Sequence, residues 1–268
     1  MRTDEMATRV ADAVDEAWHR NGSGGGHEVP VGVAATLSLL QPDDRPAFAN
    51  QVAAMTPRAY WYQSRAAWTE IVRARTDLVD AISPMISWLF DEPDEPLRER
   101  VKATADAALA AGLLDLYKPE LRHDADLLGR LLAVLKTRTE AKVNAQVYTP
   151  PDIADVFVSL TVDAVKPGQA ICEPTVGTGS FFRATAKLLR QRSLDPASMI
   201  WVGADIDELA LAVTGVNSMF WGLGHQVILY HGDTLARADW VEVAFKRRHH
   251  VLRLASEVRA ARRIFDLM

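Results

Sequence analysis

Apolar residues recur every three or four positions through most of the first 140 residues, which is the spacing of one face of a helix. Prolines divide this stretch into several pieces, and no run of β-branched residues typical of a strand interrupts it. The pattern predicts an all-helical N-terminal domain over residues 1–140. The positions that carry it most clearly are Met6, Val10, Val14 and Trp18, and further on Trp68, Ile71, Val72, Leu78 and Ile82.

A glycine-rich run, Asn-Gly-Ser-Gly-Gly-Gly at residues 21–26, follows the first predicted helix. Glycine loses more conformational freedom on ordering than any other residue, so it resists both helix and strand. We interpret the run as a flexible hinge. The alternative interpretation is an ordered loop beside a ligand.

The pattern changes near residue 150, where short apolar runs alternate with helical segments. Such alternation predicts parallel strands joined by helices, which is a doubly wound α/β sheet. We expect this core to occupy residues 141–237. Its predicted strands are residues 169–176, 199–207 and 227–235, and its predicted helices are residues 180–192 and 208–221, the second ending at Gly222 and Gly224.

The last segment, residues 238–268, has the pattern of one long helix and forms the third predicted part of the chain. From residue 241 onward it holds seven lysines and arginines against three acidic residues. Two interpretations stay open, a solvated helix face and a surface that meets DNA phosphates. On the second interpretation the candidate DNA contacts are Lys246, Arg247 and Arg248. The apolar face of the predicted helix consists of Val251, Leu254, Val258, Ala261 and Phe265.

The composition is that of an ordinary globular protein, with 49% hydrophobic and 24% charged residues among 268. A net charge of −5 gives no overall sign of nucleic-acid binding. The single cysteine, Cys172, excludes an internal disulfide, and we expect it to be packed in a buried strand. No apolar run approaches the roughly 18 residues of a membrane span. We therefore expect a cytoplasmic protein without a membrane segment.

The segment Glu-Pro-Thr-Val-Gly-Thr-Gly-Ser-Phe at residues 173–181 joins the first predicted strand to its helix. Gly177 and Gly179 allow a sharp turn and a close approach of the backbone to a ligand. The helix that begins at Ser180 offers an N-terminus, which favours negative charge. A tight turn without a ligand is the alternative for this segment taken alone.

Acidic residues end the next two predicted strands, Asp205 the second and Asp233 the third. The carboxyl ends of adjacent parallel strands meet at one crevice of the sheet. An acid at the end of the second strand is placed to accept hydrogen bonds from ribose hydroxyls, and one at the end of the third reaches an adenine amino group. The three strand ends together predict a site for an adenosine-type ligand.

Two adenosine ligands are disfavoured by the residues around the glycines. No lysine follows Gly179, as a phosphate-binding P-loop requires. Phe182 stands where the dinucleotide fingerprint needs a small residue, which disfavours NAD. Glu173 precedes the glycines and suits a cationic group such as the α-amino group of a methionyl moiety. This combination favours S-adenosylmethionine as the cofactor.

The motifs resemble those of N6-adenine DNA methyltransferases, most closely the modification subunit of type I restriction-modification systems. The segment Gln-Val-Tyr-Thr-Pro-Pro-Asp-Ile-Ala at residues 146–154 resembles the motif that precedes the cofactor site in that family. The glycine turn, the acid after the second strand and the Gly-Asp after the third follow in the family's order. The resemblance covers about residues 125–235 well. It implies a Rossmann-like methyltransferase core of three strands, incomplete by comparison with the family, after a helical domain.

The resemblance also assigns roles by position. It places Tyr148, Thr149, Pro150, Glu173, Gly177, Gly179, Ser180 and Phe181 around the methionine end of the cofactor, Asp205 at the ribose, Ile206 on the adenine face and Asp233 at the adenine amino group. Tyr148 has the alternative of a core aromatic residue. Asp207 is expected to cap the helix that follows it rather than to contact the ligand.

One family motif has no counterpart in the sequence. The family carries Asn/Asp-Pro-Pro-Tyr/Phe after its fourth strand, where it holds a base flipped out of the duplex, and no such tetrapeptide occurs among the 268 residues. No catalytic residue is therefore assigned. The sequence is either a piece cut before the catalytic strand or a cofactor-binding protein without the target-base pocket, and the long helical pattern after Asp239 favours the second.

These observations lead to one hypothesis with rivals. We expect an S-adenosylmethionine-binding protein resembling the DNA modification subunit, with DNA, a specificity subunit or a second copy of the chain as candidate partners. The rivals are a regulatory or scaffold protein that keeps the cofactor site, and a methyltransferase whose acceptor site comes from a partner chain.

Overall fold

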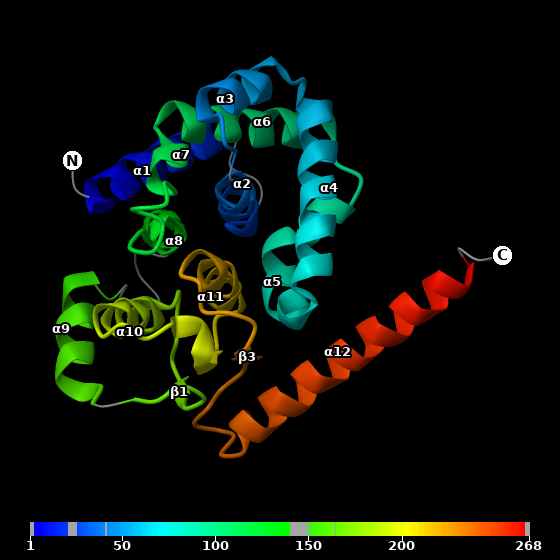
Figure 1. Ribbon diagram of the computed structural model, residues 1–268. Helices are drawn as coiled ribbons and strands as arrows, with labels where there is room; N and C mark the ends of the chain where they lie inside the picture. Colours follow the sequence, from blue (N-terminus) through cyan, green and yellow to red (C-terminus); the bar gives the residue numbers. More distant parts are fainter. Residues whose placement is uncertain are drawn as a thin grey trace.

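Helices form most of the molecule and a small parallel sheet lies at one end (Figure 1). The structure is a computed structural model, and it describes residues 3–20, 26–40, 42–139, 149, 151–163 and 165–265. The glycine-rich run at residues 21–25 lies outside the described residues, so its interpretation as a hinge stays a prediction.

The predicted helical region is confirmed over its described residues. Three of its helices begin with an acidic or hydroxyl cap, Asp44, Thr56 or Asp94, whose side chain accepts a backbone N–H, and each has a proline in its first turn. A proline there costs nothing, since its missing N–H has no intrahelical partner. The helices are α1 (Thr3–Arg20), α2 (Glu28–Leu39), α3 (Arg45–Ala54), α4 (Pro57–Ala74), α5 (Val79–Ile86), α6 (Glu95–Ala110), α7 (Leu113–Leu116) and α8 (Leu127–Thr139), with short 3-10 turns at Thr76–Leu78 and Ser87–Phe90.

The sheet has three parallel strands in the order β1-β2-β3 within the described part of the chain. Each strand is shorter than predicted. The residues predicted to continue it form the start of a loop, and these loops carry the candidate site. The strands are β1 (Ala170–Glu173), β2 (Ile200–Asp205) and β3 (Val227–His231), and the helices joining them are α10 (Ser180–Gln191) and α11 (Glu208–Phe220), with a 3-10 turn at Pro196–Ser198.

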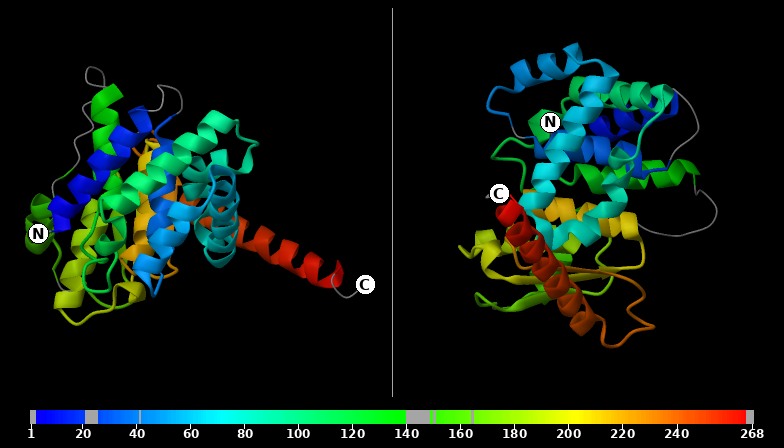
Figure 2. Two further views of the ribbon diagram at one scale, coloured as in Figure 1. Left: turned by 90° about the horizontal axis from the view of Figure 1, so that it is seen from above. Right: turned by 90° about the vertical axis from the view of Figure 1, so that its right-hand side faces the viewer.

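Helices cover both faces of the sheet, as a doubly wound arrangement requires. Trp201 packs into the large core that includes α11, and its neighbour Val202 packs on the opposite face with Trp240 of α12 (Trp240–Phe265). This alternation follows from the two-residue period of a strand. The far end of α12 extends away from the rest of the molecule (Figures 1 and 2). The predicted C-terminal helix is confirmed over the residues of α12.

One apolar core joins the helical region to the sheet. Trp18, Leu37 and Trp68 belong to the same buried cluster as Trp201 and Trp221. Figure 1 shows α11 between the sheet and the helical region. Because the core is continuous, the predicted domain boundaries at residues 140 and 237 stay a prediction.

The expectation for Cys172 is wrong, because the side chain is exposed. Cys172 lies opposite Val202 in the register, so it belongs to the sheet face that α12 covers. α12 packs against β3, two strands away, and leaves the β1 end of this face open. Among the residues that the structure describes, none of the helices is both long and apolar enough to cross a lipid bilayer.

Candidate functional site at the carboxyl ends of the strands

The glycine turn leaves β1 and enters α10 in a left-handed backbone conformation at both of its glycines. Gly177 has φ of 54° and Gly179 has φ of 94°. A Cβ placed on Gly179 would lie 2.7 Å from the ring of Trp221, so this glycine is required by packing. A Cβ placed on Gly177 would meet nothing within 4 Å among the residues that the structure describes. The backbone at Gly177 therefore faces open space, which is the arrangement that a closely bound ligand needs.

Asp205 joins the end of β2 to this turn. Its Oδ2 accepts the N–H of Gly177 at 2.7 Å, and its Oδ1 accepts the N–H of Asp207 at 2.9 Å. The backbone adds a second connection, because the Val176 N–H donates to the carbonyl of Ala204 at 2.8 Å. Asp205, which is predicted to bind the ribose, thus also fixes the conformation of the glycine turn.

Asp207 caps α11, as predicted, by accepting the N–H groups of Leu209 and Ala210, each at 3.1 Å. Lys136 of α8 donates a hydrogen bond to the same carboxylate. Burial alone would raise the pKa of Asp207, but the bond from Lys136 and the two backbone bonds outweigh it and hold the pKa below its ordinary value.

The loops after the three strands are connected to one another. The Thr234 hydroxyl lies 3.3 Å from the carbonyl of Pro174, and His231 Nε2 lies 3.1 Å from the carbonyl of Ile206. Glu173 Oε1 accepts both the N–H and the hydroxyl of Thr175, at 3.1 and 3.0 Å. The structure therefore brings the predicted residues of all three strand ends to one edge of the sheet.

Beyond Asp205 the edge is apolar and open. Ile206 is 66% exposed, although it lies between the end of β2 and the start of α11. Asp233 Oδ1 accepts the N–H groups of Leu235 and Ala236, which folds the loop after β3 back on itself. A hollow of about 700 Å³ opens beside it, lined by Tyr230, Asp233, Ala236, Arg237, Ala238 and Asp239.

The motif that precedes the glycine turn is described at Thr149, while Tyr148 and Pro150 lie outside the described residues. The Ser180 hydroxyl lies 3.4 Å from the Thr149 carbonyl, which brings this motif to the start of α10. Phe181 packs edge-on against Phe157 of α9 (Pro151–Thr161), with ring centroids 5.3 Å apart. Its ring is therefore half-buried between α9 and α10.

Thr214 is a residue of the site that the sequence interpretation missed. Its hydroxyl donates to the Gly177 carbonyl at 2.7 Å, and its side chain is fully buried on α11. The available signal was a pair of polar residues, Thr214 and Asn217, spaced three apart in a helix that is mostly apolar. Buried polar side chains need partners, so such positions indicate a specific contact.

The basic residues of α12 take part in contacts within the chain. Lys246 pairs with Glu242 at 2.5 Å, and the guanidinium of Arg247 lies 5.2 Å from the ring centre of Tyr230. Arg248 donates to the His225 carbonyl at 2.7 Å. Lys246 and Arg247 are nevertheless exposed, so both cations face solvent.

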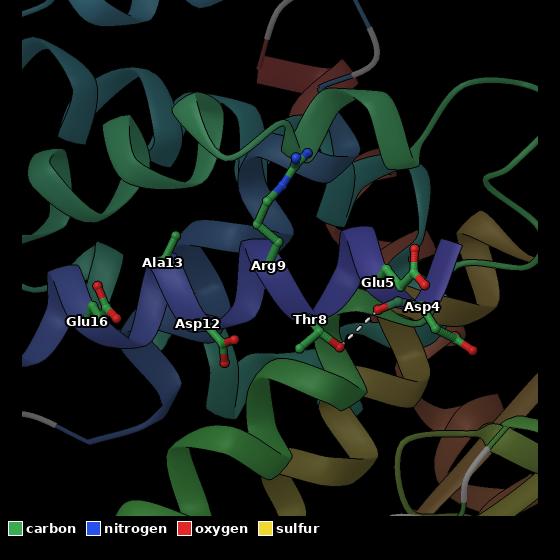
Figure 3. Close-up of a pocket in the computed structure, with 7 residues that line it drawn as sticks. All are labelled: Asp4, Glu5, Thr8, Arg9, Asp12, Ala13 and Glu16. Atoms are coloured by element: carbon green, nitrogen blue, oxygen red, sulfur yellow. Dashed lines mark hydrogen bonds between the residues drawn. The ribbon is translucent and has the colours of Figure 1, made fainter. Parts of the chain in front are cut away.

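A second hollow lies on α1 and is lined by residues of that helix alone (Figure 3). Its lining carries four carboxylates, but Arg9 points to the opposite side of the helix from Asp12. The Thr8 hydroxyl bonds to the Asp4 carbonyl within the same helix. These side chains do not converge on one point, and we interpret this face as a solvated surface.

Comparison with known proteins agrees with this geometry. A model of the N-6 DNA methylase family matches residues 124–251, which include the glycine turn and the acids of β2 and β3. A comparison with curated proteins finds no match.

Among solved structures, the chain is similar to the methyltransferase subunit of a type I restriction-modification system from Streptococcus thermophilus. The TM-score is 0.51 at 14% sequence identity, and the match covers 90% of this chain. The chain spans 60% of the length of that subunit. At this identity the likeness shows the fold, a helical region followed by a methyltransferase-like parallel sheet. Over residues 124–251 the sequence is similar to the N-6 DNA methylase family.

Proposed function

We propose that the chain binds S-adenosylmethionine in the crevice at the carboxyl ends of β1, β2 and β3. The observation that carries the proposal is the convergence of the open glycine turn with Asp205, Ile206 and Asp233. The family of N-6 DNA methylases uses this cofactor, which supplies an activated methyl group when bound.

Each strand end offers chemistry that suits one part of the cofactor. The Asp205 carboxylate has about four acceptor sites, and the N–H groups of Gly177 and Asp207 take two of them. The others are suited to ribose hydroxyls. Covering the exposed side chain of Ile206 with the adenine ring removes apolar surface from water, which favours binding. The carboxylate of Asp233 accepts a hydrogen bond from the adenine amino group.

The methionine end completes the proposed complex. Glu173 is half-buried at the end of β1 and its carboxylate attracts the α-amino group. The N-terminus of α10 follows the glycine turn and favours the negative carboxylate. The remaining residues proposed to line this end are Tyr148, Thr149, Pro150, Gly179, Ser180 and Phe181.

Titration calorimetry of the full chain tests the proposal. We expect one molecule of S-adenosylmethionine to bind per chain and NAD to give no heat of binding. Ile206→Ala should weaken the affinity about tenfold, because an apolar contact with the adenine is lost. The matched control is Leu235→Ala, which truncates a 98% exposed apolar residue in the neighbouring loop and should leave the affinity unchanged. An absence of heat with S-adenosylmethionine would overturn the proposal.

A second candidate function is methylation of an adenine in DNA with an acceptor site supplied by a further polypeptide. The observation that favours it lies at β1. Only one of its edges is paired within the described residues, and a free strand edge is a template for another strand. α9 lies on the side of α10 away from α11 (Figure 1). It exposes four apolar side chains with helical spacing, each more than half exposed: Ile153, Val156, Phe157 and Leu160.

An added strand at β1 would pair the open edge, and the exposed apolar face of α9 offers the polypeptide that carries it a second surface for packing. The test is transfer of a labelled methyl group from S-adenosylmethionine to duplex DNA. We expect transfer only when a polypeptide with an apolar strand and an Asn/Asp-Pro-Pro-Tyr/Phe segment is present. If methyl transfer stays at background level with both polypeptides present and cofactor bound, the second candidate function is overturned. A regulatory or scaffold role of the chain then remains.

Under either function the exposed Lys246 and Arg247 are candidate contacts to DNA phosphates, with Arg248 beside them. We propose a cytoplasmic location, since DNA and S-adenosylmethionine would both have to reach the site. A specificity subunit and a second copy of the chain are the other proposed partners.

A further inference from the structure

Two buried polar side chains lie on one face of α11, while the third, Ser218, bonds to the Gly215 carbonyl of its own helix. Thr214 and Asn217 are 0% and 1% exposed and stand three positions apart, so they point the same way. Thr214 donates to the Gly177 carbonyl, and Asn217 Nδ2 donates to the Thr178 carbonyl at 3.1 Å. Two consecutive carbonyls of the glycine turn are therefore bound from the buried side.

Asn217 is connected in turn to the helical region. Its Nδ2 also donates to Asp126 Oδ1 at 3.0 Å, across 91 positions of the sequence. Asp126 is 6% exposed and stands just before α8, where the same Oδ1 accepts the N–H of Gly129 at 3.0 Å. A Cβ on Gly129 would lie 2.6 Å from the Thr178 hydroxyl. The start of α8 therefore packs directly on the glycine turn.

The residue before Asp126 makes a second connection to the same turn. The Ala125 carbonyl accepts the indole N–H of Trp221 at 3.0 Å. The ring of Trp221 lies against Gly179, as its 2.7 Å approach to a Cβ there shows. Residues 125 and 126 thus hold the turn at Thr178 and at Gly179 through two buried side chains of the α/β part.

We propose that Asp126 and Asn217 are positioning residues for the cofactor turn, so that the start of α8 sets the affinity for S-adenosylmethionine. The proposal rests on the proposed function for the identity of the ligand. With the carbonyls of Gly177 and Thr178 held toward the core, neither of these two oxygens faces the crevice, where it would repel the cofactor's carboxylate. Without Asn217 the Thr178 carbonyl loses a buried donor, and the turn gains freedom to rotate.

The variants separate this role from plain stability. Asn217→Ala removes both hydrogen bonds and should weaken S-adenosylmethionine binding about tenfold. Asp126→Asn keeps an Oδ1 acceptor for both Asn217 and Gly129, so it should bind within about threefold of wild type, whereas Asp126→Ala should resemble Asn217→Ala. The matched control is Thr36→Val, which removes the buried bond from Trp68 Nε1 to Thr36, 2.7 Å long and within the helical region.

Hydrogen exchange and calorimetry on the full-length variants complete the test. We expect Asn217→Ala and Asp126→Ala to speed amide exchange in residues 175–182 and to lose cofactor affinity. Thr36→Val should lower the melting temperature. Measured 20 °C below its own melting temperature, this variant should keep the wild-type exchange in residues 175–182 and the wild-type cofactor affinity. Unchanged exchange in the turn for both alanine variants would overturn the proposal, and this readout needs no cofactor. If wild type fails to bind S-adenosylmethionine, the proposed function fails, and the exchange result still decides whether these residues hold the turn.

Discussion

The carboxylate of Asp205 accepts the N–H of Gly177 at 2.7 Å, which joins the end of β2 to the turn after β1. Its other oxygen accepts the N–H of Asp207, the cap of α11. One side chain thus fixes two loops of the candidate site. Truncating the side chain of Asp205 would therefore remove its structural hydrogen bonds together with its proposed contact to the ribose. A substitution of similar shape is needed.

Asp205→Asn should destabilise the protein and remove cofactor binding. An asparagine has one acceptor oxygen, so its NH₂ group would face one of the two backbone N–H groups, and we expect a loss of about 1–3 kcal/mol in unfolding free energy. Urea denaturation measures it. The control is Asp233→Asn, because one oxygen of Asp233 accepts both of its backbone bonds. Its stability should change by less than about 0.5 kcal/mol. Equal stability losses for the two variants would contradict this account.

Alanine at the two glycines of the turn should lower stability by different amounts and for different reasons. Gly177→Ala should cost about 1–2 kcal/mol from the left-handed backbone alone, because the new methyl meets no described residue within 4 Å. It should remove cofactor binding, since that methyl enters the space proposed for the ligand. Gly179→Ala adds a clash with Trp221 and should cost more stability. Thermal unfolding and calorimetry check both, and a Gly177→Ala variant that binds S-adenosylmethionine normally would argue against the proposed pose.

Loss of Lys136 should destabilise the protein in a pH-dependent way. Because the folded-state pKa of Asp207 lies below its ordinary value, its contribution is complete above the unfolded aspartate pKa of about 3.9. The contribution is lost as the pH falls through the lower folded-state pKa. Lys136→Met should therefore cost about 1–3 kcal/mol at pH 7 and progressively less below pH 4.

Urea unfolding at pH 7 and at several acidic pH values measures this effect. The matched control is Lys118→Met, which breaks an ion pair with Asp115 that is about half exposed on both sides. Exposed pairs contribute roughly 0–1 kcal/mol, so this variant should stay close to wild type at every pH. A Lys136→Met difference that is constant with pH would show that Asp207 is not its partner in solution.

The apolar face of α9 should act in association and not in folding. Leu160 is 80% exposed, so Leu160→Glu should change the unfolding free energy by less than about 0.5 kcal/mol. If a polypeptide docks beside β1, the same variant should abolish the complex in light scattering. Val158→Glu is the contrasting variant, because Val158 is buried against α10 and should unfold the local structure. A complex that survives Leu160→Glu would remove α9 from the docking surface.

Local periodicity was sufficient to predict the helices, the parallel strands and the strand-end acids. The Asp207 cap and the glycine positions followed from backbone rules that depend on neighbouring residues alone. The long-range contacts did not follow. The bond from Asn217 to Asp126 spans 91 positions, and the bond from Lys136 to Asp207 spans 71. Such pairings depend on how α8 packs on the turn, which no periodicity encodes.

The misplacement of Cys172 has a related cause. A short apolar run predicts a strand, but whether each face is covered depends on helices elsewhere in the chain. α12 covers the β2 and β3 side of its face and leaves Cys172 open. Phe181 illustrates the same limit, since its contact with Phe157 depends on the packing of α9 against α10.

Hydrogen exchange of the full chain with and without S-adenosylmethionine tests the central claim most directly. If the three strand ends form one cofactor site, the cofactor should slow exchange together in residues 174–181, 205–208 and 232–236. It should leave the amides of α1 and α4 unchanged. Exchange that is unaltered in all three segments at saturating S-adenosylmethionine would contradict the claim.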